Sequence, residues 1–337
     1  MIRFIDFLGG RDFIEKKYPI QDRATIHHLR SYLENEYSED AKLTEECFFR
    51  VNEKDPDWME KQKKRILANS SSESLAALGE MRAYADLLNM GFDVIPNGTK
   101  TGADFTLQHS KTNEKAFVEV ATKTLPSNNI RPNPNTVSKE QRTAIFEMAY
   151  FGFPKDGENF VENAVSKIAS TKEDFHQASA SIPSLLFIDF QNLPLNSSMI
   201  DNSFPCSSFQ GAIYSGALWC GLYGEKGTPL YEDARIGTSK ADIVCMKHSG
   251  MFAKGNSNNY AGVFCSFSSA REGLCFFENP EKTIIPKWIK VHMSCNHRFN
   301  LQCSCLKYGD IDLQEYIDLR NHQIADLGKM YSDIDVY

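Results

Sequence analysis

The feature that most constrains the fold is a nearly continuous apolar run at residues 184–190, Ser-Leu-Leu-Phe-Ile-Asp-Phe, which lies between Pro183 and Asn192. An amphipathic strand would alternate apolar and polar residues, whereas this run hardly alternates. The pattern is typical of a central strand that is buried on both faces. We therefore expect a sheet that is covered by other elements on both sides.

A helix is predicted well before this strand, over residues 73–88. Its apolar residues recur at steps of three and four, as one face of a helix requires. They are Leu75, Leu78, Met81, Tyr84 and Leu88. Ser70 followed by Glu73 predicts a capping box at the start, and Gly91 predicts a left-handed residue just beyond the end.

Three short strands are predicted next, at residues 92–96, 103–108 and 116–123, with Asn97-Gly98 as a hairpin turn between the first two. Helices at residues 139–150 and 161–178 then lead to the strand at 184–190. The order is helix, three strands, helices, strand. It predicts an α/β protein with a mixed sheet and helices against it.

The flanking parts complete a division into three regions. Residues 1–69 are predicted to be a helical segment, and they contain a basic run at Lys61, Lys63, Lys64 and Arg65 that is either a solvated helix face or a phosphate contact. Residues 70–190 form the core. Residues 191–337 form a C-terminal extension, with a helix near 209–222, strands at 260–267 and 273–277, and a helix near 313–327.

Composition narrows the class of protein. The chain has 337 residues, of which 42% are hydrophobic, so it can bury a substantial core. The start resembles no signal peptide, no window approaches the roughly 18 apolar residues of a membrane helix, and the nine cysteines are expected to be reduced thiols. We expect a cytoplasmic protein without membrane contact. Gly224-Glu225-Lys226-Gly227-Thr228 lacks P-loop spacing, so no nucleotide cofactor is expected.

Two smaller patterns are given structural interpretations. His27-His28 has no supporting carboxylate pattern and is predicted to be a pair on a helix surface. Cys295, His297, Cys303 and Cys305 contain zinc-type ligands, but their spacing is not that of a standard zinc site. We interpret the cysteines mainly as small buried hydrophobic residues.

Three acidic residues fall inside these apolar elements. Glu80 lies in the predicted helix, Asp104 in the second strand and Glu119 in the third. An unpaired buried carboxylate is costly, and one arrangement that would justify all three is a shared divalent cation. Mg²⁺ is a hard ion that prefers oxygen ligands.

In these residues and in the order of its elements, the segment at about 70–190 resembles the PD-(D/E)XK nuclease superfamily, which has the restriction-endonuclease-like fold. The matching residues are Gly79-Glu80, Asp104 and Glu119. The resemblance implies a Mg²⁺-dependent endonuclease, with Mn²⁺ as a substitute, that hydrolyses DNA. It also implies restriction or antiphage defence as a setting, and a homodimer, because duplex cleavage needs one site for each strand.

The resemblance implies roles for particular residues. Asp104 and Glu119 would be the main metal ligands, helped by the carbonyl of Val120 or Ala121. Glu80 would bind a second metal or a metal-bound water. The family pattern places a catalytic lysine two residues after Glu119, where this chain has Ala121. The replacements offered by the sequence are Lys123 on the same strand and Lys167 or Lys172 on the helix at 161–178.

The missing lysine leaves a second interpretation open. The chain could be a catalytically degenerate member of the same fold that binds nucleic acid or serves as an assembly module. A third interpretation is an enzyme of another class in which the three acids are incidental. It predicts that Glu80, Asp104 and Glu119 lie far apart.

Overall fold

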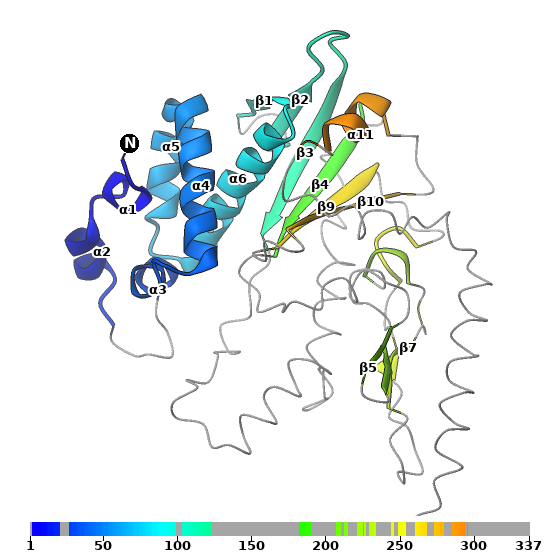
Figure 1. Ribbon diagram of the computed structural model, residues 1–337, viewed down its shortest axis with the longest axis horizontal. Coiled ribbons are helices and arrows are strands. Elements are labelled where there is room, and N and C mark those ends of the chain that lie inside the picture. The colour runs from blue at the N-terminus through cyan, green and yellow to red at the C-terminus, as the bar shows by residue number, and fades with distance from the viewer. Residues whose placement is uncertain are drawn as a thin grey trace, which may run out of the picture.

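The computed structural model describes residues 2–20, 27–98, 103–122 and 182–190, together with shorter segments between residues 207 and 295. The fold is α/β. A six-stranded mixed sheet, in the order β1-β2-β3-β4-β9-β10, is flanked by helices (Figure 1). The expected class is therefore confirmed. Both β9 and β10 come from beyond residue 190 and extend the same sheet as β1 to β4.

The elements of this layered structure have the following bounds. The N-terminal helices are α1 (Phe4–Phe7), α2 (Arg11–Lys17), α3 (His28–Glu34), α4 (Glu39–Lys54), α5 (Pro56–Ile66) and α6 (Ser71–Asn89). The strands of the large sheet are β1 (Asp93–Pro96), β2 (Phe105–Gln108), β3 (Lys115–Thr122), β4 (Ser184–Asp189), β9 (Gly262–Ser266) and β10 (Leu274–Glu278). A late helix, α11, spans Lys287–Met293.

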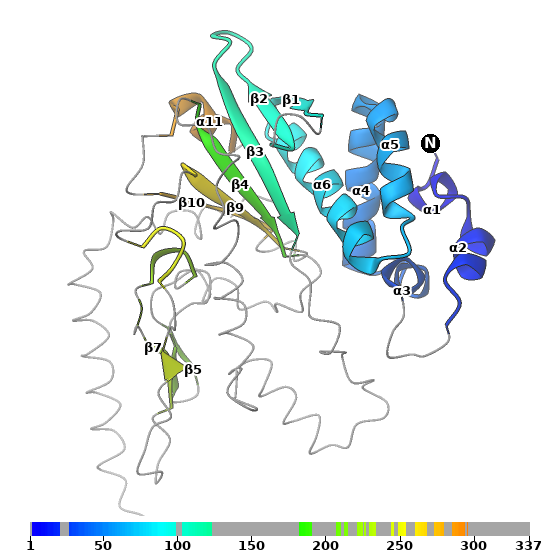
Figure 2. The ribbon, with the colours of Figure 1, turned by 180° about the vertical axis from the view of Figure 1, so that it is seen from behind.

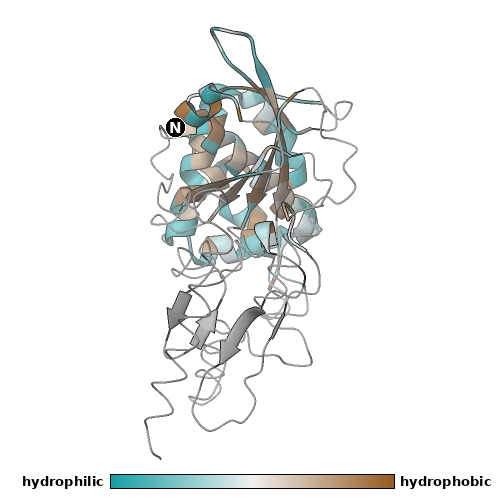
Figure 3. Cartoon of the chain, turned by 90° about the vertical axis from the view of Figure 1, so that its right-hand side faces the viewer, coloured by the Kyte–Doolittle hydropathy of each residue, from teal (hydrophilic) through white to brown (hydrophobic). Residues whose placement is uncertain are grey.

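The apolar run forms the central strand that its composition predicts. Every residue of β4 is buried, and the strand pairs in parallel with β3 on one side and β9 on the other. The outer pairs, β1 with β2, β2 with β3 and β9 with β10, are antiparallel. The strands are apolar along much of their length (Figure 3). Burial on both faces explains why β4 lacks the alternation of an amphipathic strand.

Helix α6 lies between the sheet and the pair formed by α4 and α5, and both views show this (Figures 1 and 2). The helix ends as predicted, because Gly91 adopts a φ of +79° just past its last residue. The predicted capping box is wrong. Ser70 is the N-cap, but its hydroxyl contacts the Ser72 hydroxyl at 2.8 Å and accepts no backbone N–H.

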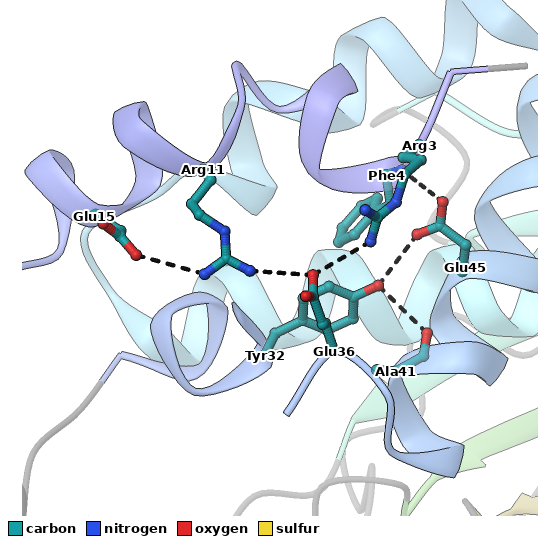
Figure 4. A network of polar contacts seen from close by, with 8 residues as sticks. All are labelled: Arg3, Phe4, Arg11, Glu15, Tyr32, Glu36, Ala41 and Glu45. Atoms are coloured by element: carbon teal, nitrogen blue, oxygen red, sulfur yellow. Dashed lines mark hydrogen bonds and ion pairs between the residues drawn. The ribbon is translucent and has the colours of Figure 1, made fainter. Parts of the chain in front are cut away.

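The N-terminal helices are tied together by a network of polar contacts (Figure 4). Glu36 accepts ion pairs from Arg3 at 3.4 Å and Arg11 at 3.2 Å. Glu45 accepts from the backbone N–H of Phe4 at 2.9 Å and from the Tyr32 hydroxyl at 3.1 Å. Phe4 also packs against Phe48 of α4. These contacts join α1, α2 and α3 to one another and to α4.

Other details correct the sequence predictions. The backbone N–H of Asn97 donates to the carbonyl of Asp104 at 2.8 Å. The β1–β2 hairpin therefore continues beyond Asn97-Gly98, and a two-residue turn there is excluded. In the segment expected to be helical at 209–222, the structure has β5 (Ser207–Phe209) and β6 (Ala212–Tyr214). Helix α11 was not predicted, and the expected helices at 139–150, 161–178 and 313–327 lie outside the described residues.

A second, four-stranded sheet has the order β5-β6-β7-β8, with β7 at Pro229–Asp233 and β8 at Val244–Cys245. All three of its pairings are antiparallel. None of the helices in the described part of the chain combines the length and the apolar character that crossing a bilayer requires.

Candidate functional site

The structure brings Asp104 and Glu119 together on adjacent strands. Asp104 comes directly before β2, and its Oδ2 accepts a hydrogen bond from the backbone N–H of Val120 at 2.7 Å. Because Phe105 pairs with Val118 in antiparallel register, the next residues outward, Asp104 and Glu119, lie opposite each other. Asp104 is partly exposed and Glu119 is buried. The two carboxylates therefore share one site at the edge of the β2–β3 pairing.

The alternation of β3 separates this site from the α6 side of the sheet. Val118 and Val120 belong to the apolar core that includes α6, and Thr122 on the same face lies against Gly79 of α6. Successive strand residues point to opposite faces, so Glu119 projects away from α6. Thr122 therefore lies on the side away from Glu119.

Tyr260 is a neighbour that the sequence did not reveal. It lies just before β9, and its side chain is buried. Burial raises the pKa of its hydroxyl, and the negative charges of Glu119 and Asp104 raise this pKa further. The phenol therefore lies within electrostatic reach of both carboxylates and stays protonated beside them. No local pattern could have predicted this, because only the pairing of β9 with β4 carries Tyr260 to the site.

Glu80 is held by α5. Its carboxylate takes two hydrogen bonds from the guanidinium of Arg65, at 2.5 and 2.8 Å, and a third from the amide of Gln62 at 3.1 Å. Bidentate pairs of this kind fix both position and orientation. The pKa of Arg65 is raised mainly by these hydrogen bonds to Glu80, and more weakly by the charges of Asp104 and Glu73.

Arg65 is thus paired with Glu80 and lies within electrostatic reach of Asp104. The basic run that contains Arg65 was noticed in the sequence, but its pairing with Glu80 was not. Asp104 and Val120 are sixteen residues apart in the sequence, and the pairing of β2 with β3 brings them together. The contact of Arg65 with Glu80 instead requires α5 to pack on α6. Helix packing of this kind has no sequence signal of its own.

Within the described ranges, no three His, Cys, Asp or Glu side chains are grouped so that they could hold a metal ion together. Asp104 and Glu119 do fit a hard cation, because each carboxylate can offer an oxygen from a neighbouring strand and such ions accept waters as their other ligands. Val120 is fixed beside them through its N–H. Glu80 is already matched by the positive charge of Arg65.

The position two residues after Glu119 is Ala121, which is partly exposed. The three lysines offered as replacements, Lys123, Lys167 and Lys172, lie outside the described residues.

A separate polar cluster lies on the other face of the sheet, under α6. Thr122, Asp189 and Ser266 form a row across the ends of β3, β4 and β9. Arg82 of α6 pairs with Asp189 at 2.5 Å, and both side chains are almost completely buried. The Ser266 hydroxyl donates to Asp86 at 3.3 Å. This cluster fastens α6 to the sheet.

The histidine pair belongs to the packing between helices, so the prediction of a surface pair is wrong. His27 stacks on Tyr18 with ring centroids 3.8 Å apart. Nε2 of His28 lies 2.9 Å from the Ser74 hydroxyl. Because that hydroxyl donates to the carbonyl of Ile66, it accepts from His28, which places the imidazole proton on Nε2.

Comparison of the chain with models of protein families, with curated proteins and with solved structures found no match. The assignment of a function therefore depends on the geometry of the site.

Proposed function

We propose that the chain is a metal-dependent nuclease that hydrolyses DNA phosphodiester bonds, built on a restriction-endonuclease-like core. The observation that carries the proposal is the pair of carboxylates, Asp104 and Glu119, fixed opposite each other on adjacent strands by the bond from Val120. The order α6, β1, β2, β3, β4, with β3 and β4 parallel, is the order that this fold family would have.

Hydrolysis of a phosphodiester requires an activated water and stabilisation of negative charge on the phosphate. A bound Mg²⁺ supplies both, by lowering the pKa of a water and neutralising developing charge. Asp104 and Glu119 would hold that ion, with Val120 supplying a carbonyl. Glu80 is held on α6 by Arg65 and Gln62, and its role toward a second metal or a metal-bound water stays a prediction. Tyr260, protonated beside both carboxylates, can donate a hydrogen bond and limit their mutual repulsion.

The test is cleavage of plasmid and linear DNA with Mg²⁺ or Mn²⁺, comparing the wild type with Glu119→Gln and Asp104→Asn. Each variant removes one negative charge and keeps the shape, so loss of cutting by at least about a hundredfold is expected if metal binding is lost. Glu114→Gln, on the exposed end of the β2–β3 hairpin, is the matched control and should cut like the wild type.

Cutting that survives both site substitutions would contradict the assignment of the site. Two active sites are needed to cut both strands of a duplex, so a homodimer belongs to the proposal, and restriction or antiphage defence is the setting proposed for it. Analytical ultracentrifugation of the chain with and without DNA tests the dimer.

A second candidate function is a catalytically degenerate module that binds nucleic acid or organises an assembly. The observation that favours it is Ala121, which is unable to offer the charge that a lysine two residues after Glu119 would offer. It predicts DNA binding that is independent of metal and no cutting by the wild type. Calorimetry with Mn²⁺ separates the two, because only the nuclease requires the ion.

A further inference from the structure

A basic pocket lies between the ends of α2 and α5 and the start of α6. Its volume is about 530 Å³, and Lys17, Lys64, Arg65, Asn69 and Glu73 are among the residues that line it. Two lysines and one arginine face a single acidic side chain. The chain as a whole carries a net charge of −7, so the net positive charge of this pocket is opposite in sign to that of the chain.

The lining is held in place by contacts among the helices. The Lys17 ammonium donates to Oδ1 of Asn69 at 3.3 Å, and the Tyr18 hydroxyl donates to the carbonyl of Ala68 at 3.2 Å. These bonds join the end of α2 to the turn between α5 and α6. Two hydrogen bonds thus fix the end of α2 against the turn that forms the other side of the pocket.

The charges of the pocket differ in how far they are already neutralised. Arg65 is matched by Glu80, and Lys63, one residue before Lys64, is 4.0 Å from Glu60 and lies over the ring of Phe7. Among the described residues, neither Lys17 nor Lys64 has an ion-pair partner within 4.0 Å. The two lysines are consequently the cations that remain available to an anion.

Arg65 connects the pocket to the acidic site. It lines the pocket, binds Glu80 and lies within electrostatic reach of Asp104. An anion bound by Lys17 and Lys64 would therefore lie next to Arg65, which lines the same pocket. A polymer with phosphates along its length can place one phosphate in this pocket and another at the pair of carboxylates, which a single free phosphate cannot do.

We infer that Lys17 and Lys64 bind a backbone phosphate of duplex DNA in the pocket formed by α2, α5 and α6. The inference rests on the proposed function for its choice of polymer. Phosphate contacts fix the position and register of a duplex without reading its sequence. The pocket would thus set how the duplex crosses the pair of carboxylates.

The test measures DNA binding without any divalent cation, so that binding is separated from cutting. A fluorescent duplex of about twenty base pairs is titrated with the full chain in EDTA at several salt concentrations, and the slope of log K against log salt is determined. The variants are Lys17→Gln, Lys64→Gln and the double variant. The control is Lys42→Gln combined with Lys111→Gln, two exposed lysines on α4 and on the β2–β3 hairpin.

Each pocket substitution should lower the magnitude of the slope by about 1, and the double variant by about 2. The control changes the net charge equally and should keep the wild-type slope. A double variant with the slope of the control, or a wild type that binds no duplex, overturns the inference.

Failure of this inference differs from failure of the proposed function. Metal-dependent cutting with a slope unaffected by the two lysines refutes the phosphate pocket and leaves the nuclease. Lysine-dependent binding without cutting in Mg²⁺ or Mn²⁺ refutes the nuclease and leaves the pocket.

Discussion

Gly79 of α6 and Thr122 of β3 approach so closely that a Cβ on Gly79 would overlap the Thr122 Oγ1. Asp189 Oδ2 would be 2.9 Å from the same Cβ. The helix therefore lies directly on the ends of β3 and β4 at this residue. Because Glu80 is next along α6, the close approach also sets how far Glu80 stands from the strand that carries Glu119.

Gly79→Ala should destabilise the protein by about 1–3 kcal/mol, the usual range for forcing extra volume into a packed core. The intrinsic preference of helices for alanine opposes this effect and is smaller. Denaturant unfolding measures the difference. The double variant Gly79→Ala with Thr122→Ala should recover part of the loss, because it removes the nearer of the two contacts. Equal stability of Gly79→Ala and the wild type would show that α6 can move away from the sheet.

The pair formed by Arg82 and Asp189 offers a second prediction. Their side chains are 4% and 0% exposed, so removing one charge takes the ion-pair partner away from a buried group. Arg82→Met or Asp189→Asn should each cost about 3–5 kcal/mol in unfolding free energy. Combining the two should cost much less than the sum, because no uncompensated charge remains. Additive losses in this double-mutant cycle would mean that the two side chains act independently.

The fold was predictable where burial of an element shows in the distribution of its apolar residues. Helix α6 and strand β4 show this, because each is buried along most of its length and its pattern follows from that burial. The segment at 209–214 was misjudged because a short, weakly patterned run fits a helix or a strand equally well, and strand pairing decided in favour of β5 and β6. Helix α11 is short and is stabilised by packing against other elements. The local sequence does not indicate those contacts.

The site was predictable only in part for a related reason. Asp104 and Glu119 stand in strands that are neighbours in sequence, so their meeting follows from a hairpin. Arg65 and Tyr260 reach the same region through helix packing and through a crossover to β9, and the sequence contains neither relationship. The sequence alone therefore does not show which residues bind Glu80.

Acid should weaken the fold through His28. Burial lowers the pKa of this imidazole well below its ordinary value, and the positive charges of His27 and Arg82 lower it further. Below a pH of about 6.5, His28 binds a proton in the unfolded chain but stays neutral in the folded chain. The contribution of His28 to the free energy of unfolding is therefore fully present above that pH and is lost as the pH decreases. The slope contributed by one such group approaches about 1.4 kcal/mol per pH unit.

Unfolding by urea at several values between neutral pH and about pH 5 measures this slope. His28→Gln keeps a donor for the Ser74 hydroxyl and removes the titration, so its stability should depend less steeply on pH. Some dependence should persist, because burial also lowers the pKa of His27. A variant as steep as the wild type would exclude His28 as the group responsible.

The last prediction concerns Arg65 and the affinity for metal. Arg65 is a cation beside Glu80 and within reach of Asp104, and a cation near two carboxylates opposes the binding of a second cation there. Arg65→Gln should therefore raise the affinity for Mn²⁺ several-fold in calorimetry. The change in stability should be small, since the side chain of Arg65 is 39% exposed and such pairs contribute little in solvent.

Lys61→Gln, an exposed position on the same helix, removes the same charge and should leave Mn²⁺ affinity unchanged. Weaker Mn²⁺ binding by Arg65→Gln would mean instead that Arg65 is needed to hold Glu80 in place for the ion.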